Sequence, residues 1–198
     1  MNEAHAYLAE ILAFEKADQV ERPPTGAVLF VGSSTIRLWE TLKEDFAPVP
    51  VINRGFGGSE VTDLIGYLGR VILPYRPRLM VVYSGDNDLT RGKSPETVFA
   101  DYQQFIALVQ QHLPQTRIIL VSTKPSPARA ELIPDVQKLN AFLQEFVLSD
   151  DRLAYVDIYS AMIDDAGSPR AELFTDDGLH MNSAGYQLWK ERIQPFLQ

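Results

Sequence analysis

The stretch AVLFVGSSTIRLWETL, residues 27–42, changes character at its sixth residue. Its first five residues are all apolar, which favours a strand that is buried on both faces. Gly32, two serines and Thr35 follow, and the remainder has a composition that a helix tolerates. Two interpretations of these hydroxyl groups are open. Either Ser33, Ser34 or Thr35 caps the helix, or one of the serines is a nucleophile held at the end of the strand.

The rest of the chain repeats the order of strand and helix. Short apolar runs bounded by Gly, Pro or polar residues predict five strands, at 27–31, 49–52, 79–83, 117–122 and 153–158. Apolar residues at helical spacing predict helices at 4–16, 62–73, 94–114, 136–148 and 184–197. This alternation predicts an α/β fold in three layers, with helices on both faces of a parallel sheet.

The length of 198 residues suits one substantial domain. No linker, repeat or low-complexity segment divides the chain, so we predict a single domain over 1–198, with residues 1–26 as a helical extension packed on it. The proline-rich segment TKPSPARAELIP, residues 123–134, follows the fourth predicted strand. It is a candidate rim for a site, because α/β sheets bind ligands beyond the carboxyl ends of their strands.

Composition excludes several classes of function. The 26 acidic against 18 basic residues give a net charge of −8, which argues against nucleic acid or an anionic membrane as the main partner. Cysteine is absent, which excludes disulfides, thiolate metal sites and a cysteine nucleophile. No apolar run approaches the roughly 18 residues of a membrane span, and residues 1–24 do not read as a secretory signal. We expect a cytoplasmic protein without stable membrane insertion; the sequence carries no signal for its oligomeric state.

The three histidines differ in their surroundings. His5 lies in the N-terminal segment and His112 at a helix end, where solvated histidines are common. His180 lies in the polar loop FTDDGLHMN, three residues after Asp177. This spacing lets a carboxylate bind one ring nitrogen and leave the other free, as a general base requires. The alternative is that the loop only makes turns.

A glycine-rich loop, NRGFGGSEV at 53–61, follows the second predicted strand. Gly55, Gly57 and Gly58 let backbone amides approach a ligand closely. The loop has neither the spacing nor the lysine of a phosphate-binding P-loop. A backbone N–H that faces an oxyanion is the remaining functional interpretation.

The stretch YSGDNDL at 83–89 follows the third predicted strand. Asn87 supplies a side-chain donor that can stabilise developing negative charge. Alternatively, Asp86 and Asp88 bind a metal ion, although the spacing does not match an EF-hand calcium loop. Because these loops follow parallel strands, all of them lie at one edge of the predicted sheet.

Together the four loops resemble the blocks of the SGNH hydrolases, also called the GDSL esterase/lipase family, over residues 29–181. The first block usually reads G-D-S and here reads G-S-S, so Ser33 takes the place of the aspartate and Ser34 aligns with the nucleophile. The GSSTIRLW form is similar to that of small bacterial members. The other matches are Gly58, Asn87 in GDND, and the D-x-x-H block of Asp177 and His180.

The resemblance implies a flavodoxin-like α/β/α sandwich and a serine esterase that works through an acyl-enzyme, without cofactor or metal. Ser34 would be the nucleophile, His180 the base, and Asp177 the group that orients the base. The backbone amides of Ser34 and Gly58, with the Asn87 side chain, would form the oxyanion hole.

Substrate recognition is the least determined part of this hypothesis. The candidates are four side chains that flank the loops, with ordinary packing as their alternative: Arg37, Trp39, Arg54 and Phe56. We expect a small-molecule ester with a short acyl group, such as acetyl on a carbohydrate. Lysophospholipase or thioesterase activity at the same site is the alternative.

Two other classes of function stay open. A metal-dependent phosphoesterase would use as ligands Asp86, Asp88, Asp177 and His180. A non-catalytic ligand-binding module on the same scaffold would leave Ser34 without a chemical role.

Overall fold

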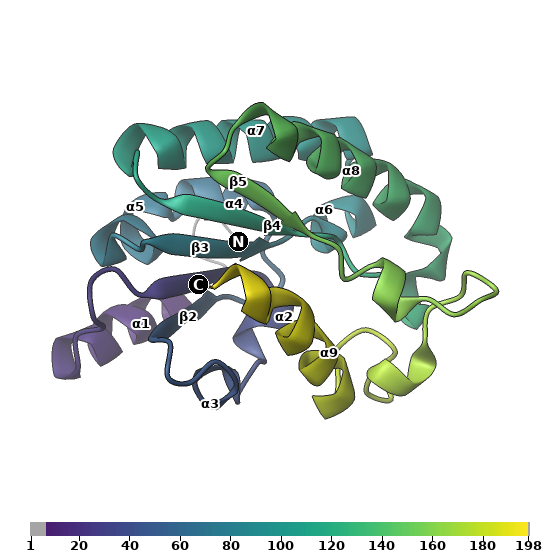
Figure 1. The fold of residues 1–198 in the computed structure, drawn as a ribbon, viewed down its shortest axis with the longest axis horizontal. Coiled ribbons are helices and arrows are strands. Elements are labelled where there is room, and N and C mark those ends of the chain that lie inside the picture. Colours follow the sequence, from purple (N-terminus) through teal and green to yellow (C-terminus); the bar gives the residue numbers. More distant parts are fainter. Residues whose placement is uncertain (1–6, 198) are drawn as a thin grey trace.

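A computed structural model describes residues 7–197 of the protein. Its centre is one sheet of five parallel strands in the order β2-β1-β3-β4-β5 (Figure 1). The strands are β1 (Val28–Gly32), β2 (Val51–Gly55), β3 (Leu79–Tyr83), β4 (Arg117–Val121) and β5 (Leu153–Val156). This is the flavodoxin-like order, which confirms the predicted fold class.

Helices cover both faces of the sheet. The longer ones are α1 (Leu8–Val20), α7 (Pro95–His112), α8 (Ile133–Phe146) and α9 (Ser183–Ile193). The shorter ones are α2 (Ser34–Arg37), α3 (Leu42–Asp45), α4 (Val61–Gly66), α5 (Leu68–Val71) and α6 (Asp86–Thr90). Single 3-10 turns lie at η2 (Leu73–Tyr75), η4 (Val147–Ser149), η5 (Ser160–Met162), η6 (Ala171–Leu173) and η7 (Gln194–Phe196), and η3 spans Pro127–Leu132. None of the helices within residues 7–197 is long and apolar enough to cross a membrane.

The strands have two buried faces because successive side chains point to opposite sides. In β1, Leu29 and Val31 pack with α1, α4, α5, α7 and α8, whereas Val28 and Phe30 pack with α2, α3 and α9. All five β1 residues are buried. This explains why the sequence shows a continuous apolar run here instead of an alternating one.

Some predicted helices differ from those observed. The predicted helix at 62–73 is two helices, α4 and α5, interrupted at Tyr67 between Gly66 and Gly69, which favour helix poorly. The predicted end at 197 is wrong because α9 ends at Ile193, just before Pro195, which cannot donate a helical hydrogen bond. In the N-terminal segment the helix runs to Val20, four residues past the predicted end. Residues 4–6 of that prediction lie outside the described residues, as does His5.

The loops of interest meet at the carboxyl edge of the sheet. In register, Gly32 at the end of β1 pairs with Gly55 of β2 and with Tyr83 of β3. β2 lies on one side of β1, and β3 lies on the other side of β1. The direction in which strands are added to the sheet therefore reverses between β1 and β3. Ser34 follows β1 and Asn87 follows β3, which places both at this switch point, where α/β sheets bind ligands.

Candidate active site

The position of Ser34 depends on the glycine two residues before it. Gly32 has a φ of +149°, and a Cβ there would lie 1.8 Å from the carbonyl oxygen of Tyr83 on the neighbouring strand. Only glycine therefore lets β1 end against β3 and turn directly into α2. Ser34 is the first residue of α2 and is partly exposed. Its hydroxyl is thereby held on a rigid junction at the edge of the sheet.

The neighbouring hydroxyls do not cap this helix. Ser33 occupies the N-cap position of α2, but its side chain makes no capping hydrogen bond and is buried. Its Oγ has no hydrogen-bond partner among residues 7–197. Thr35 is buried inside α2. The interpretation of Ser33 or Thr35 as a cap is therefore wrong, because both side chains face the interior.

The loop that carries His180 is fixed by its own hydrogen bonds. Asp177 Oδ1 accepts from the backbone N–H of Leu179 (2.8 Å), the N–H of His180 (2.9 Å) and the hydroxyl of Thr175 (2.8 Å). The N–H of Thr175 donates to the His180 carbonyl at 2.8 Å. These bonds close the loop, so that the second carboxylate oxygen of Asp177 faces the imidazole.

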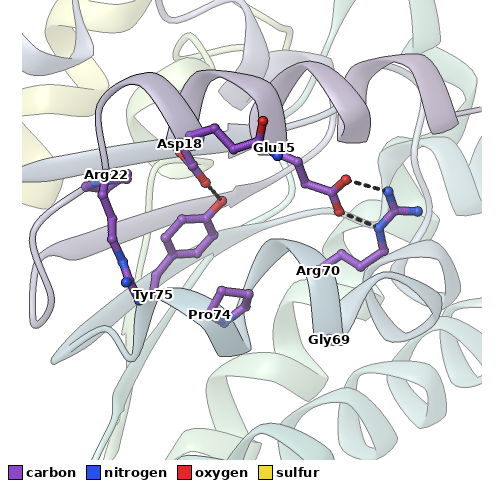
Figure 2. Close-up of a pocket in the computed structure, with 9 residues that line it drawn as sticks. Glu15, Asp18, Arg22, Gly69, Arg70, Pro74 and Tyr75 are labelled. Carbon is purple, nitrogen blue, oxygen red and sulfur yellow. Dashed lines mark hydrogen bonds and ion pairs between the residues drawn. The ribbon is translucent and has the colours of Figure 1, made fainter.

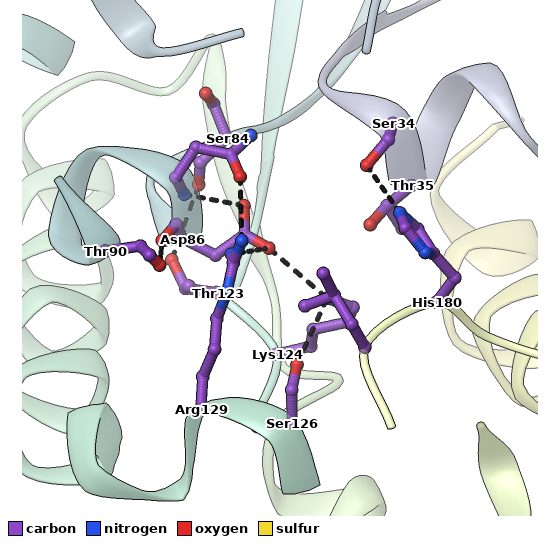
Figure 3. A network of polar contacts seen from close by, with 12 residues as sticks. Ser34, Thr35, Ser84, Asp86, Thr90, Thr123, Lys124, Ser126, Arg129 and His180 are labelled. Atoms are coloured by element: carbon purple, nitrogen blue, oxygen red, sulfur yellow. Dashed lines mark hydrogen bonds and ion pairs between the residues drawn. The ribbon is translucent and has the colours of Figure 1, made fainter. Parts of the chain in front are cut away.

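Ser34, His180 and Asp177 form a continuous chain of contacts. Asp177 Oδ2 lies 2.6 Å from His180 Nδ1, and His180 Nε2 lies 3.1 Å from Ser34 Oγ. Figure 3 shows the serine and histidine side chains pointing toward each other. The N–H of Leu179, together with His180 and Thr175, holds the pKa of Asp177 well below its usual range. An ionised carboxylate keeps the proton on Nδ1 and leaves Nε2 to accept from the serine hydroxyl.

The glycine loop lies against the end of β1. The Gly32 carbonyl accepts from the N–H of Phe56 (3.0 Å) and from the hydroxyl of Ser59 (3.3 Å). Gly58, within this loop, has a φ of +76°, which glycine adopts at little cost. Among residues 7–197, no acceptor takes the N–H of Gly58 or that of Ser34. Both donors are available to an oxygen of a ligand.

Helix α1 contacts the same loop, and no sequence pattern predicts this contact. The Tyr7 hydroxyl donates to the Gly58 carbonyl at 3.0 Å, and both Glu10 carboxylate oxygens lie 3.2 Å from the N–H of Gly57. Glu10 also pairs with Arg37 at 3.5 Å. The aromatic and acidic residues of this N-terminal helix carry no sequence signal of the loop that it contacts.

Asn87 lies on a short helix where a loop was expected. Gly85, with a φ of +107°, is the N-cap residue of α6, which begins at Asp86. The Asn87 Nδ2 donates to the Ser59 carbonyl at 3.0 Å. The loop after β2 and the helix after β3 are thereby joined, and Ser59 also donates to Gly32 at the end of β1.

Two cations surround the carboxylate next to Asn87. Asp86 Oδ2 lies 3.3 Å from Lys124 Nζ and 3.2 Å from Arg129 Nη1 (Figure 3). Burial opposes ionisation of Asp86, but Lys124 and Arg129 outweigh it, and the pKa of Asp86 is lowered. Sequence reasoning identified the segment 123–134 as a rim but neither of its cations. A lysine three residues after a buried strand was the available signal.

The carboxylates proposed as metal ligands have other partners. Asp88 is buried and binds Lys93 Nζ at 3.1 Å and the N–H of Val61 at 3.2 Å, while Asp86 faces two cations. Within residues 7–197, no three His, Asp or Glu side chains gather as a group that could hold a metal ion. The predicted four-ligand set is therefore not assembled, because the charges of Asp86 and Asp88 are already matched by cations.

Three of the four predicted substrate contacts are buried. Trp39 and Phe56 are fully buried, and Trp39 donates to Asp45 at 2.8 Å. Arg54 is also buried; it pairs with Asp18 and donates to the Tyr75 hydroxyl at 2.6 Å. These side chains pack into the core or against α1, which the sequence alone did not reveal.

The partners of Arg54 line a pocket of about 340 Å³ against α1, in which Asp18 accepts from Tyr75 (Figure 2). None of the predicted catalytic residues lines this pocket. Arg37 alone of the four predicted contacts is exposed, with its guanidinium beside Gly57. It remains a candidate.

Comparisons with known proteins agree with the fold described above. The GDSL-like Lipase/Acylhydrolase family matches residues 30–188. A protein from Bacteroides fragilis NCTC 9343, assigned as an acylhydrolase, has 22% identity and a TM-score of 0.83, covering 100% of this chain and 97% of that one. A GDSL-like lipase from Bacteroides thetaiotaomicron VPI-5482 has 20% identity and a TM-score of 0.82, covering 96% of this chain and 97% of that one. An acetyl-xylooligosaccharide esterase from Geobacillus Stearmophilus has 14% identity and a TM-score of 0.72, covering 88% of this chain and 95% of that one. No curated protein matches the sequence.

The fold and the family match define a hydrolase with a flavodoxin-like α/β fold that acts on ester bonds. The chain belongs to the GDSL-like lipase/acylhydrolase family. This confirms the resemblance drawn from the four loops.

Proposed function

We propose that this protein is a serine esterase in which Ser34, His180 and Asp177 carry the reaction through an acyl-enzyme. The observation that carries the proposal is the alignment of Ser34 Oγ, 3.1 Å from His180 Nε2, with His180 Nδ1 at 2.6 Å from Asp177. A nucleophile within hydrogen-bond reach of a base, itself held by a carboxylate, is the arrangement that nucleophilic catalysis requires.

In this mechanism Ser34 Oγ attacks the carbonyl carbon of the ester while His180 Nε2 takes the hydroxyl proton. The tetrahedral intermediate collapses when His180 returns that proton to the leaving alcohol, which leaves an acyl group on Ser34. A water molecule then attacks the acyl carbon with His180 again as the base. Release of the acid restores the free serine.

The oxyanion of the intermediate would bind three donors. They are the N–H groups of Ser34 and Gly58, neither of which has an acceptor among residues 7–197, and the Asn87 side chain. Donors that are already oriented stabilise the charge without reorganisation. We expect Asn87→Ala to lower kcat about a hundredfold or more while the fold is kept, measured with p-nitrophenyl acetate and a thermal melt. Normal turnover in this variant would contradict the assignment.

For the substrate we propose a short acyl group, such as acetyl on a carbohydrate or another small alcohol. One of the similar structures is that of an acetyl-xylooligosaccharide esterase, and this likeness supports the proposal. A series of p-nitrophenyl esters from acetate to palmitate measures the preference. A maximum at long chains would favour lysophospholipase or thioesterase activity instead.

Labelling tests the nucleophile directly. A fluorophosphonate probe, followed by peptide mass spectrometry, should modify Ser34, and the label should disappear in His180→Ala. Label on Ser33 would shift the assignment by one residue. A folded protein without label would contradict the serine mechanism.

A further inference from the structure

The Asn87 side-chain amide is held on both of its sides. Its Nδ2 donates to the Ser59 carbonyl at 3.0 Å, and its Oδ1 accepts from Arg129 Nη2 at 3.2 Å. If the amide turned over, its oxygen would face a carbonyl oxygen and its nitrogen would face a guanidinium. The two contacts therefore fix one orientation, and one Nδ2 hydrogen is left that neither contact uses.

Arg129 reaches two consecutive residues of α6 with one guanidinium. Besides the bond to Asn87, its Nη1 lies 3.2 Å from Asp86 Oδ2. The other oxygen of Asp86 accepts the backbone N–H of Asn87 at 3.1 Å. Lys124 is the second cation on Asp86 (Figure 3). Asp86 thus attracts the arginine as an ion pair, and the arginine holds the Asn87 amide by a hydrogen bond.

The segment that carries Arg129 also contacts the loop of the base. Within η3, the N–H of Ala128 donates to the Gly178 carbonyl at 3.0 Å. The Arg129 side chain is only 17% exposed, so it is not a freely solvated surface charge. One short turn therefore contacts the Asp177–His180 loop through its backbone and Asn87 through a side chain.

We propose that Arg129 is a positioning residue for the esterase reaction: it orients and polarises the Asn87 amide, so that the unused Nδ2 hydrogen binds the oxyanion. The inference rests on the proposed function. A cation bound to the amide oxygen draws electron density from the nitrogen, which makes the N–H a stronger donor. The donor is oriented before the substrate arrives, which is the condition for strong stabilisation of an oxyanion.

The test is a double-mutant cycle between Arg129 and Asn87. Arg129→Met keeps the aliphatic stem and removes the guanidinium, and kcat and KM are measured with p-nitrophenyl acetate. We expect kcat to fall about tenfold to a hundredfold, with KM within about twofold, because the missing interaction acts in the transition state. In the Asn87→Ala background the same substitution should change kcat by less than about twofold, since its target is gone. Arg129→Lys keeps the positive charge but lacks the planar guanidinium that contacts two residues at once. Its kcat should lie between those of the wild type and Arg129→Met.

Arg70→Met is the matched control, because Arg70 makes a two-bond ion pair with Glu15 on α1 and has no contact with the site residues. It should keep kcat within about twofold. If Arg129→Met does not fold, Arg129→Lys and Arg129→Gln complete the cycle.

An equal loss from Arg129→Met with and without Asn87 would overturn the inference, since the arginine would then act independently of the amide. Unchanged kcat in Arg129→Met would also overturn it. Unchanged kcat in Asn87→Ala alone would remove the oxyanion assignment of the proposed function, and this inference with it. The three failures are therefore distinguishable.

Discussion

Asp177 divides its two carboxylate oxygens between different partners. Oδ1 accepts from the N–H groups of Leu179 and His180, whereas Oδ2 faces His180 Nδ1. In Asp177→Asn the amide oxygen can keep the backbone bonds, but the NH2 group must then face Nδ1. The histidine would carry its proton on Nε2 and lose the acceptor for the Ser34 hydroxyl. We expect kcat to fall by a factor of about 1,000 to 10,000 without unfolding, measured as initial rates with p-nitrophenyl acetate.

Asp176→Asn separates this effect from the loss of one negative charge. Asp176 is the preceding residue, is exposed, and makes no hydrogen bond or ion pair with residues 7–197. Its variant should keep kcat within about twofold, because exposed charges are screened. Comparable losses in both variants would indicate that the charge of the loop, and not the tautomer of His180, is what matters.

Asp86 makes a pH-dependent contribution to stability. Burial raises its pKa, but Lys124 and Arg129 more than compensate, so the folded-state pKa lies below the unfolded value of about 3.9. The unfolded state therefore binds more protons in this range, and the stabilisation is present above about pH 4 and is lost as the pH falls through the folded pKa. Asp86→Asn should lower the free energy of unfolding by about 3 kcal/mol or more at pH 7, because it leaves Lys124 buried with one carboxylate fewer.

Urea unfolding of the wild type and Asp86→Asn at pH 7 and pH 3 measures this contribution. The difference between the two proteins should be smaller at pH 3. A difference that grows on acidification would contradict the sign of the shift.

At the scale of single residues, the sequence predicted polar groups whose spacing is local and could not predict partners that are distant. Asp177 and His180 lie three residues apart in one loop, and they are in contact. For Trp39 and Arg54 the sequence left substrate contact and ordinary packing both open, and the packed structure shows that they are buried. Arg129 was missed because its partners precede it by more than 40 residues. The catalytic roles of Ser34, Gly58 and Asn87 stay predictions.

At the scale of elements, patterns of burial were predictive, whereas interruptions of helices were not. Most of the five strands are continuous apolar runs, and the structure confirms all five within a few residues at each end. A helix was expected after Gly32, but the bounds of α2 were not predicted. Helices α3 and α6 were not predicted at all, because four or five residues are too few for a periodic pattern. Their positions depend on contacts such as that between Gly32 and β3, which are made only in the folded chain.

Helix α1 supports the loop that carries Gly58, and this contact can be tested. Glu10→Ala removes the acceptor of the Gly57 N–H and the partner of Arg37. Loss of a hydrogen bond of about 1 kcal/mol that holds the loop corresponds to a decrease in kcat of about fivefold, with little change in KM. Steady-state kinetics with p-nitrophenyl acetate measure it.

Glu15→Ala is the control for Glu10→Ala, because Glu15 lies on the same helix and pairs with Arg70 instead of the loop. It should leave kcat unchanged within about twofold. Equal effects of the two substitutions would show that α1 acts through stability alone.

At the scale of the molecule, the site depends on both faces of the sheet at once. Ser34 begins a helix that packs with α9 on one face, whereas Asn87 lies on α6, which contacts α7 and α8 on the other. The side chains meet only because one sheet joins the two faces. Independent unfolding of either face would therefore disassemble the site.

The predicted single domain makes this dependence measurable. Both tryptophans, Trp39 and Trp189, are buried in the core shared by α2, α3 and α9, so tryptophan fluorescence reports the unfolding of that face. Most of the helical circular dichroism comes from the longer helices, and the two longest, α7 and α8, cover the opposite face. We expect urea unfolding curves from the two probes to coincide, as they do for a two-state domain. Separate midpoints would show that the faces unfold independently, and the prediction of one domain over residues 1–198 would then be wrong.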